Sequence, residues 1–187
     1  MRITSGQLGG RTIQTPGGHG TRPTTDRARQ AIFNILSHAA WAPDCEGARV
    51  LDLFAGSGAL GFEALSRGAE TCLFVETSAE ARGVIRDNIE AFGLFGHTRI
   101  HRRSATSLGP RPASTGARFD LVFLDPPYGL GLGEQALAEV CEHDWVRDEA
   151  LFVFECGVDE TPDLPKFEPL DVRTYGAAKV LFLRKLR

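Results

Sequence analysis

The stretch RVLDLFAGSGALGFEALSRG, residues 49–68, joins a short apolar run, a glycine-rich turn and an apolar helical pattern. The run RVLDLF (49–54) is typical of a central parallel strand, which is buried on both faces. The turn contains the pattern G-x-G-x-x-G, formed by Gly56, Gly58 and Gly61. Glycine lets a ligand approach the backbone closely, and the last glycine lets the helix pack tightly on the strand. In this context the pattern indicates a site for an adenosine-containing ligand.

Strand and helix patterns alternate along the rest of the chain. A helix is expected from about Asp26, which would cap it, and another over 58–67. Thr77 and Glu80 form the pattern of a capping box for a helix that runs to about Phe92. The other predicted elements are a helix over 134–143 and strands at 71–76, 98–101, 119–125, 150–155, 170–175 and 179–186.

This alternation predicts a parallel, doubly wound sheet with right-handed crossovers. The last two strands are joined by a short turn near Gly176, so they should pair antiparallel. We therefore expect a Rossmann-like α/β domain. Its seven-stranded, mostly parallel sheet would have an antiparallel final strand and a short N-terminal hairpin extension.

The charge is distributed unevenly along a chain of otherwise globular composition, with 42% hydrophobic and 24% charged residues. Residues 1–30 hold five arginines against Asp26, a charge of +4, whereas the remaining 16 basic and 23 acidic side chains give −7. We divide the chain into a basic arm or hairpin, 1–23, and one domain, 24–187. Contact with nucleic-acid phosphates would explain the arm, and a solvated tail explains it equally well.

Two carboxylates near the glycine turn narrow the choice of ligand. Glu76 ends the second strand, twenty residues after Gly56, where it can accept hydrogen bonds from both ribose hydroxyls. Asp52 lies before the turn, where a carboxylate suits an ammonium group. An amino-acid-derived cofactor has such a group and a dinucleotide lacks it. These features leave both nicotinamide cofactors and S-adenosylmethionine open.

The strand FDLVFLD (119–125) runs directly into Asp125-Pro126-Pro127-Tyr128. An exocyclic amine on a base is a poor nucleophile, because its lone pair is delocalised into the ring. Asp125 and the carbonyl of Pro126 can accept hydrogen bonds from its two N–H groups, and Pro127 holds that carbonyl in place. Tyr128 offers a flat face for stacking, worth roughly 1–3 kcal/mol. These four residues predict catalysis of amine methylation on a nucleic-acid base.

The two motifs together resemble the class I S-adenosylmethionine methyltransferases with an [ND]-P-P-[YF] motif. Within them the chain is similar to the RsmD family of bacterial small-subunit ribosomal RNA guanine-N2 methyltransferases. The likeness runs almost end to end, through RITSGQLGGRTIQTP (2–16), RPTTDRARQAIFNIL (22–36), VLDLFAGSGALGFEALSRGA (50–69), FVE (74–76), DLVFLDPPYG (120–129) and RTYG (173–176).

The resemblance implies methyl transfer from S-adenosylmethionine to a guanine in 16S ribosomal RNA, within an assembled or partly assembled 30S subunit. The cofactor-binding residues expected are Asp52, Phe54, Ala55, Gly56, Ser57, Gly58, Gly61, Glu76, Ser104, Ala105 and Asp125. The RNA-binding residues expected are Arg2, Arg11, Arg22, Thr24 and Arg27.

The chain departs from the family pattern at two places. The family's Asp that binds the adenine amino group is replaced by Ser104, in the stretch Arg102-Arg103-Ser104-Ala105. The family's Y-G-[DE]-T turn is 175–178, Tyr-Gly-Ala-Ala, which leaves any polar role of that turn open. Arg99, with the two arginines before Ser104, could bind phosphate or lie in a solvated loop.

Other functions leave parts of the pattern unexplained. Adenine-N6 DNA methyltransferases share the four-residue motif but generally carry a target-recognition region, for which only about 45 residues at the front are available. A glutamine-N5 protein methyltransferase would more often have Asn at Asp125. A nicotinamide oxidoreductase leaves the motif 125–128 without a role, and a non-catalytic RNA-binding protein would not need the glycine loop.

The remaining expectations concern location, metal and assembly. The N-terminus lacks the apolar core of a signal peptide and no stretch approaches a membrane span, so a cytoplasmic protein without membrane contact is expected. The four cysteines and five histidines show no metal-ligand spacing, so no metal is expected. No apolar surface stripe is visible, which favours a monomer.

Overall fold

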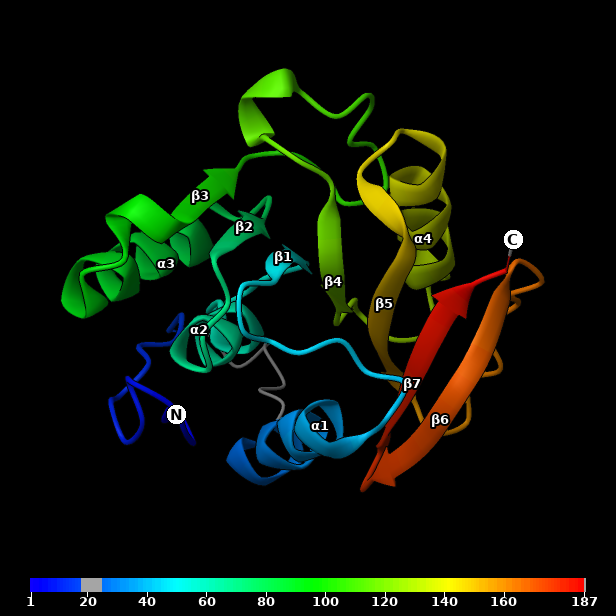
Figure 1. Ribbon diagram of the computed structural model, residues 1–187, viewed down its shortest axis with the longest axis horizontal. Helices are drawn as coiled ribbons and strands as arrows, with labels where there is room; N and C mark the ends of the chain where they lie inside the picture. Colours follow the sequence, from blue (N-terminus) through cyan, green and yellow to red (C-terminus); the bar gives the residue numbers. More distant parts are fainter. Residues whose placement is uncertain (18–24, 187) are drawn as a thin grey trace.

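The computed structural model describes residues 1–17 and 25–186, and seven strands form one sheet in the order β3-β2-β1-β4-β5-β7-β6 (Figure 1). The strands are β1 (Arg49–Leu53), β2 (Thr71–Val75), β3 (Thr98–His101), β4 (Phe119–Leu124), β5 (Val146–Gly157), β6 (Phe167–Tyr175) and β7 (Ala178–Lys185). Neighbours from β3 to β5 are parallel, whereas β7 runs antiparallel to both β5 and β6. The predicted doubly wound sheet with an antiparallel final strand is confirmed.

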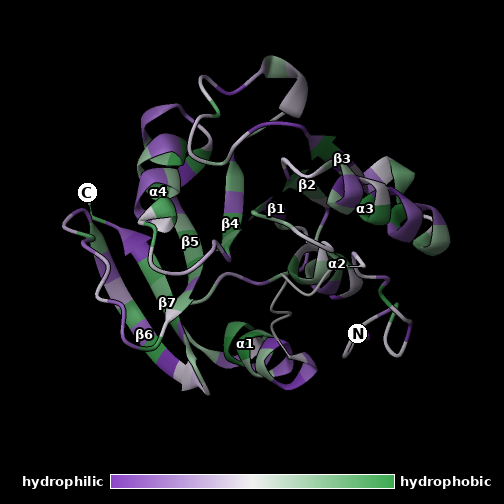
Figure 2. Cartoon of the chain, turned by 180° about the vertical axis from the view of Figure 1, so that it is seen from behind, coloured by the Kyte–Doolittle hydropathy of each residue, from purple (hydrophilic) through white to green (hydrophobic). Residues whose placement is uncertain are grey.

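Helices cover both faces of the sheet (Figure 1). They are α1 (Asp26–His38), α2 (Ala59–Ser66), α3 (Ala79–Phe92) and α4 (Leu132–Glu142), with short 3₁₀ turns at Phe95–His97 and Ala113–Thr115. The first three helices share a core with one face of the sheet, and α4 shares a core with the other. Figure 2 shows hydrophobic residues along the central strands and purple residues on the outer faces of the helices.

Strand β4 shows why the central strands read as continuous apolar runs. Leu121 and Phe123 belong to the core beneath α1, where the Phe123 ring lies 5.5 Å from that of Phe33. Val122 and Leu124 belong to the core beneath α4. Because side chains alternate between faces and both faces are covered, every position on the strand is apolar except Asp120, its second residue.

Four predicted element boundaries were wrong. Thr25, not Asp26, caps α1, because its hydroxyl accepts the Ala28 N–H at 3.2 Å. Ser78, not Thr77, caps α3 in the same way, and α4 begins two residues before the predicted Glu134. Strand β5 begins at residue 146 rather than 150, since the polar residues at its start carry no apolar signal.

The N-terminal hairpin is confirmed and is bound to the domain. Arg2 and Thr12 form an antiparallel bridge, and both Ile3 and Ile13 are only 1% exposed within the core. The fully buried carboxylate of Glu63, on α2, accepts the Thr4 N–H at 2.9 Å and thereby ties the hairpin to the helix. The predicted boundary at residues 23 and 24 lies outside the described residues.

None of the helices among residues 1–17 and 25–186 has the length and apolar character needed to cross a membrane.

Candidate active site

A cavity of about 940 Å³ lies at the carboxyl ends of β1, β2 and β4. This is the edge of an open α/β sheet at which ligands bind, and the volume is typical of small-molecule sites. The predicted site residues on its wall are Asp52, Phe54, Ala55, Gly56, Ser57, Glu76, Ser104, Ala105, Asp125, Pro126, Pro127 and Tyr128. The structure thus brings the glycine turn and the four-residue motif to one cavity, although Gly61 and Asp125 lie 64 positions apart in the chain.

The glycine turn exposes its backbone to the cavity. Phe54 has a φ of 58° and Gly56 a φ of 57°, a region that side chains with a Cβ disfavour. A Cβ on Gly56 would meet nothing nearer than the Phe54 carbonyl oxygen, at 4.0 Å, so open space lies over this part of the backbone. The turn is held by the Ala55 N–H, which donates to the Val75 carbonyl at 3.0 Å. A ligand can therefore approach the main chain here.

The other two glycines of the pattern lie behind this wall. A Cβ on Gly61 would lie 2.5 Å from the Phe74 ring and 2.6 Å from the Cys72 sulphur. A Cβ on Gly58 would lie 2.7 Å from the Phe62 ring. Gly58 and Gly61, which we expected to bind cofactor, are thus placed where α2 packs against β2.

Glu76 connects the glycine turn to the start of α3. Its Oε2 accepts the Gly56 N–H at 2.8 Å, and its Oε1 accepts the Ser78 N–H at 2.8 Å. Each carboxylate oxygen has a second lone pair, so the half-buried group can still accept hydrogen bonds from a ligand. The backbone contacts fix the orientation in which Glu76 faces the cavity.

Asp52 lies beneath the turn and is only 2% exposed. Burial raises the pKa of its carboxyl from the ordinary 3.8 to about 8, the Gly61 N–H that it accepts at 3.0 Å lowers it, and the charge of Glu76 raises it. At neutral pH the carboxyl is therefore mostly protonated. A cationic group in the cavity would favour its ionised form.

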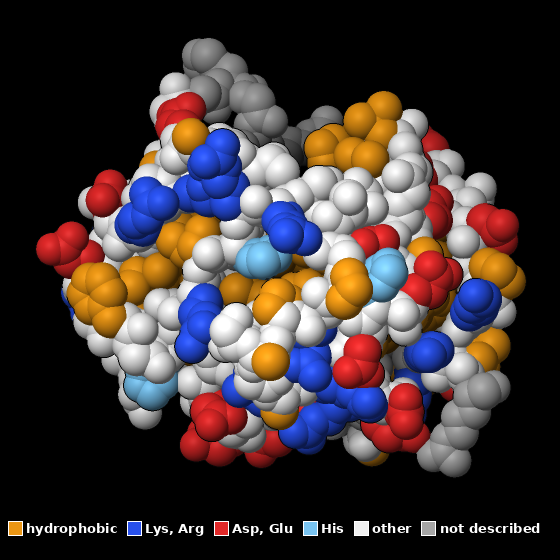
Figure 3. Space-filling model, turned by 90° about the horizontal axis from the view of Figure 1, so that it is seen from above, with side chains coloured by type: hydrophobic (Ala, Val, Ile, Leu, Met, Phe, Trp, Pro, Cys, Tyr) orange, Lys and Arg blue, Asp and Glu red, His pale blue; other side chains and the backbone are white. Residues whose placement is uncertain are grey.

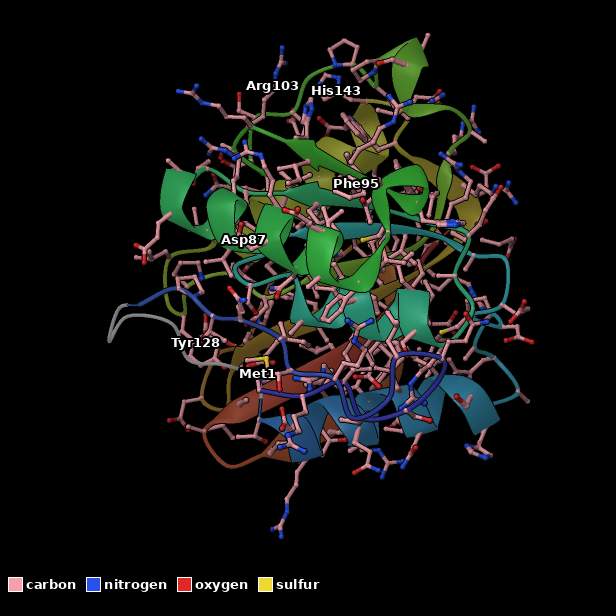
Figure 4. All side chains as sticks on the ribbon, turned by 90° about the vertical axis from the view of Figure 1, so that its left-hand side faces the viewer. Met1, Asp87, Phe95, Arg103, Tyr128 and His143 are labelled. Carbon is pink, nitrogen blue, oxygen red and sulfur yellow. The ribbon has the colours of Figure 1, made fainter. Side chains whose placement is uncertain are left out.

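The loop after β3 supplies a third part of the wall. The Ser104 hydroxyl lies 2.8 Å from the Thr106 hydroxyl and accepts the Thr106 N–H at 3.3 Å. Arg103 also lines the cavity and donates to the Leu108 carbonyl. Figure 4 shows Arg103 toward the opposite end of the view from Tyr128, and the face of the molecule in Figure 3 carries basic and acidic side chains together. Arg99 and Arg102 are exposed on the same segment.

The four-residue motif forms the opposite wall. Asp125 is half-buried, Pro126 is buried and Pro127 is exposed. Tyr128 is half-buried and its hydroxyl donates to Oε1 of Glu155 at 2.6 Å. The motif is thus placed at the mouth of the cavity, with the tyrosine ring held from the neighbouring strand.

The N-terminal hairpin also reaches the cavity, which local sequence patterns do not reveal. Met1, Thr15 and Pro16 line it, and Figure 4 shows Met1 near Tyr128. Asn88 on α3 holds this part of the hairpin: it accepts the Gln14 N–H at 2.9 Å and donates to the Gln14 carbonyl at 3.0 Å. The same amide lies 3.4 Å from the carbonyl of Ser57 in the glycine turn.

The predicted RNA-binding residues differ in their surroundings. Arg2, Arg11 and Arg27 are exposed, and Arg11 in addition donates to the Ala91 carbonyl and lies 5.0 Å above the Phe92 ring. Arg22 and Thr24 lie outside the described residues. Arg29, counted in the +4 charge of residues 1–30, is fully buried in ion pairs with Asp26 and Glu63. The accessible basic charge of residues 1–30 is therefore smaller than the sequence indicates.

Comparison with known proteins gives full-length matches. The family described as Conserved hypothetical protein 95 matches residues 1–184. The Ribosomal RNA small subunit methyltransferase D of Escherichia coli (strain K12) is 37% identical over 166 residues, 88% of this chain and 79% of that protein. The protein of the same name from Haemophilus influenzae is 34% identical over 161 residues, 86% and 80% of the two chains. The solved structure of yhhF from Escherichia coli superposes with a TM-score of 0.84 at 32% identity, covering 100% of this chain and 98% of the other.

Proposed function

The chain belongs to the family described as Conserved hypothetical protein 95, and we propose that it methylates the exocyclic N2 amine of a guanine in small-subunit (16S) ribosomal RNA, using S-adenosylmethionine. The resemblance to the RsmD family is confirmed by the family match and by two relatives of that name at 34% and 37% identity. The proposal adds the reaction, the cofactor and the roles of individual residues.

The observation that carries the proposal is the shared cavity. Gly56 and Glu76 form one wall and Asp125 and Tyr128 form the other. A methyl donor seated against the first wall would face an amine seated against the second. Holding two reactants in this way removes much of the entropic cost of their encounter.

The residues of the first wall fit S-adenosylmethionine. The open space over Gly56 admits a ligand to the backbone, Glu76 presents carboxylate oxygens to ribose hydroxyls, and buried Asp52 suits an ammonium group. When bound, this cofactor supplies a methyl group on a positively charged sulphur, which is already activated for transfer. A nicotinamide dinucleotide has no ammonium group for Asp52 and gives the motif 125–128 no role.

The second wall acts on the target amine. Asp125 and the Pro126 carbonyl accept hydrogen bonds from its two N–H groups, which favours a pyramidal nitrogen with a localised lone pair. With a bound methyl donor the N–C bond would form as the donor's S–C bond breaks, and the nitrogen would then lose a proton to Asp125 or to water. Tyr128 stacks on the base and sets its plane, a contact worth roughly 1–3 kcal/mol.

We assign RNA contact to the hairpin side of the cavity. Met1, Thr15 and Pro16 are on its wall, and exposed Arg2 follows Met1 in the hairpin. Exposed Arg27 lies on α1, where the neighbouring Asp26 accepts the Arg2 N–H. Phosphate contacts by these arginines would position RNA without reading its sequence. A 30S subunit or an assembly intermediate is the proposed substrate, and the enzyme is proposed to act as a monomer.

The test is to incubate the protein and labelled cofactor in parallel with unmethylated small subunits, naked 16S RNA and DNA. We expect label in N2-methylguanosine from one of the two RNA-containing samples. The Asp125→Ala variant serves as the inactive control. N6-methyladenine in the DNA sample would instead support the DNA methyltransferase alternative, and no transfer to any sample would contradict the proposal.

A further inference from the structure

The catalytic wall is held in place by carboxylates that follow it in the chain by about thirty residues. The motif 125–128 leaves β4 as a loop and has no secondary structure of its own. A loop that must present an acceptor and a flat ring in one orientation needs supporting contacts from neighbouring elements. The neighbouring strand β5 and the turn after it supply them.

The first support is Glu155 on β5, which is only 7% exposed. Its Oε1 accepts the hydroxyl proton of Tyr128 at 2.6 Å. An O–H···O⁻ bond of this length is a strong, charge-assisted one. Tyr128 lines the cavity, so the bond at the far end of the ring limits the ring plane that faces a stacked base.

The second support is Glu160, in the turn after β5. Its Oε1 accepts the Gly129 N–H at 2.9 Å, and its Oε2 accepts the Gly157 N–H. Gly157 also lies beside the tyrosine, since a Cβ there would be 3.4 Å from Tyr128 Cδ2. One carboxylate therefore joins the end of the catalytic loop to the end of β5.

The turn that carries Glu160 is itself attached to β7. Lys179 donates to the Glu160 carbonyl, and the Val158 N–H donates to the Ala177 carbonyl at 2.9 Å. The Val158–Ala177 hydrogen bond joins two backbone groups, so the departure from the family pattern at Ala177 leaves it intact. The supports reach the sheet by two routes, through β5 and through β7.

We propose that Glu155 and Glu160 are positioning residues for methyl transfer: Glu155 holds the Tyr128 ring in the plane that stacks on the target base, and Glu160 holds the end of the loop at Gly129. The inference rests on the proposed function, since it assigns these residues a part in the same reaction. Neither carboxylate lines the cavity, so both act through the motif.

The first test compares Tyr128→Phe, Glu155→Ala and the double variant in methyl transfer. Each single change removes one partner of the half-buried Tyr128–Glu155 hydrogen bond, and we expect kcat to fall about tenfold. The Michaelis constant for cofactor should stay unchanged. The double variant should be no slower than the slower single variant, because both lose the same interaction. Glu155→Gln keeps an acceptor oxygen and should retain most of the activity.

A second readout is independent of turnover. The chain has two tyrosines, Tyr128 and Tyr175, so NMR of protein with isotope-labelled tyrosine gives two ring signals. Glu155→Ala should shift the phenolic carbon signal of Tyr128 and leave that of Tyr175 in place. Tyr175→Phe assigns the signals and serves as the matched control for Tyr128→Phe in turnover. Glu168→Ala, an exposed change on β6, controls for loss of a negative charge.

For Glu160 the expected effect of Glu160→Ala is a several-fold fall in kcat, as for the loss of one hydrogen bond to a charged group. The proposal is overturned if Tyr128→Phe and Glu155→Ala keep full turnover, if their effects add, or if the Tyr128 signal does not move. It is also overturned if these variants lose only stability, with unchanged kcat per folded molecule. An inactive wild-type protein would contradict the proposed function, and the tyrosine signals would still decide whether the ring is held.

Discussion

The two walls of the cavity are built in different ways. On the cofactor wall, Glu76 contacts Gly56 and Asp52 contacts Gly61, so the supporting partners lie within one strand–turn–helix–strand unit. On the catalytic wall, Tyr128 and the loop after it depend on Glu155 and Glu160, beyond a whole helix. The first wall is a local structure, and the second is assembled by tertiary contacts.

Because the two walls are built differently, substitutions in them should have different effects. A change on the cofactor wall disturbs a compact unit that also packs α2 against the sheet, so folding and ligand affinity should respond together. A change on the catalytic wall disturbs a loop at the cavity mouth, so turnover should respond while folding is largely kept.

The largest expected effect is that of Asp125→Ala on turnover. Removing an acceptor that supports the reacting nitrogen should lower kcat by roughly 10²–10³-fold, the range found when one group that stabilises a transition state is lost. Cofactor affinity, measured by calorimetry, should fall far less than kcat, although Asp125 is also among the expected cofactor-binding residues. Glu76→Ala is the matched change on the other wall and should weaken cofactor binding first. Equal losses of cofactor affinity in the two variants would contradict the division between the walls.

The next effect concerns stability. In Gly61→Ala the new methyl group would lie 2.5 Å from the Phe74 ring, and overpacking of this kind costs about 1–3 kcal/mol. Gly83 on α3 is the control, because nothing lies within 4 Å of its Cβ position and Gly83→Ala should stabilise the helix by up to about 1 kcal/mol. Urea unfolding measures both. Unchanged stability with weaker cofactor binding in Gly61→Ala would place Gly61 at the ligand instead.

The same contrast explains which residues of the site could be predicted from the sequence. The glycine turn, Glu76 and the motif 125–128 were predicted because each follows an apolar strand, and parallel strands bring their carboxyl ends to one edge. Glu155 and Glu160 carry no such signal: one ends a strand and the other lies in a turn. The approach of Met1 and Pro16 to the cavity was equally hidden, since it depends on burial of Ile3 and Ile13 and on the contact with Glu63.

The fold, too, could be predicted from the sequence only in part. All seven strands were predicted, because strand and helix periodicity is a property of short windows. The position of β7 between β5 and β6 could not be read from the sequence, since it depends on pairing between distant segments. The caps of α1 and α3 were each misplaced by one residue, because adjacent Thr, Asp and Ser residues all suit an N-cap.

A smaller effect is expected from pH on the cofactor wall. The pKa of Asp52 is raised to about 8 in the folded protein, so between about pH 4 and pH 8 the folded state keeps a proton that the unfolded state has lost. The free energy of unfolding should therefore fall as pH rises through this window, and Asp52→Asn should remove that part of the decline. A free energy of unfolding that stays constant over this pH window in the wild type would contradict the raised pKa of Asp52.

The same carboxyl should make cofactor binding depend on pH. An ammonium group near Asp52 favours the ionised form, so binding at pH 7 should release up to about one proton. Affinity should then rise with pH and level off above about pH 8, the pKa in the free protein. Calorimetry in two buffers of different ionisation enthalpy measures the proton count, and the catalytic-wall variant Asp125→Ala should leave it unchanged. Equal proton release in Asp52→Asn would show that another group titrates.

The smallest effect is expected beyond both walls, at the exposed arginines. If Arg27 contacts one RNA phosphate, Arg27→Ala should reduce the slope of log affinity against log salt by about 0.7–0.9. Deleting residues 1–22 is a poor substitute for this variant, because it would also remove buried Ile3 and Ile13 from the core. Arg11→Ala is the internal comparison: its guanidinium is packed on Phe92, so the salt slope should hardly change. An unchanged slope in Arg27→Ala, or a larger change in Arg11→Ala, would indicate that RNA does not bind along α1.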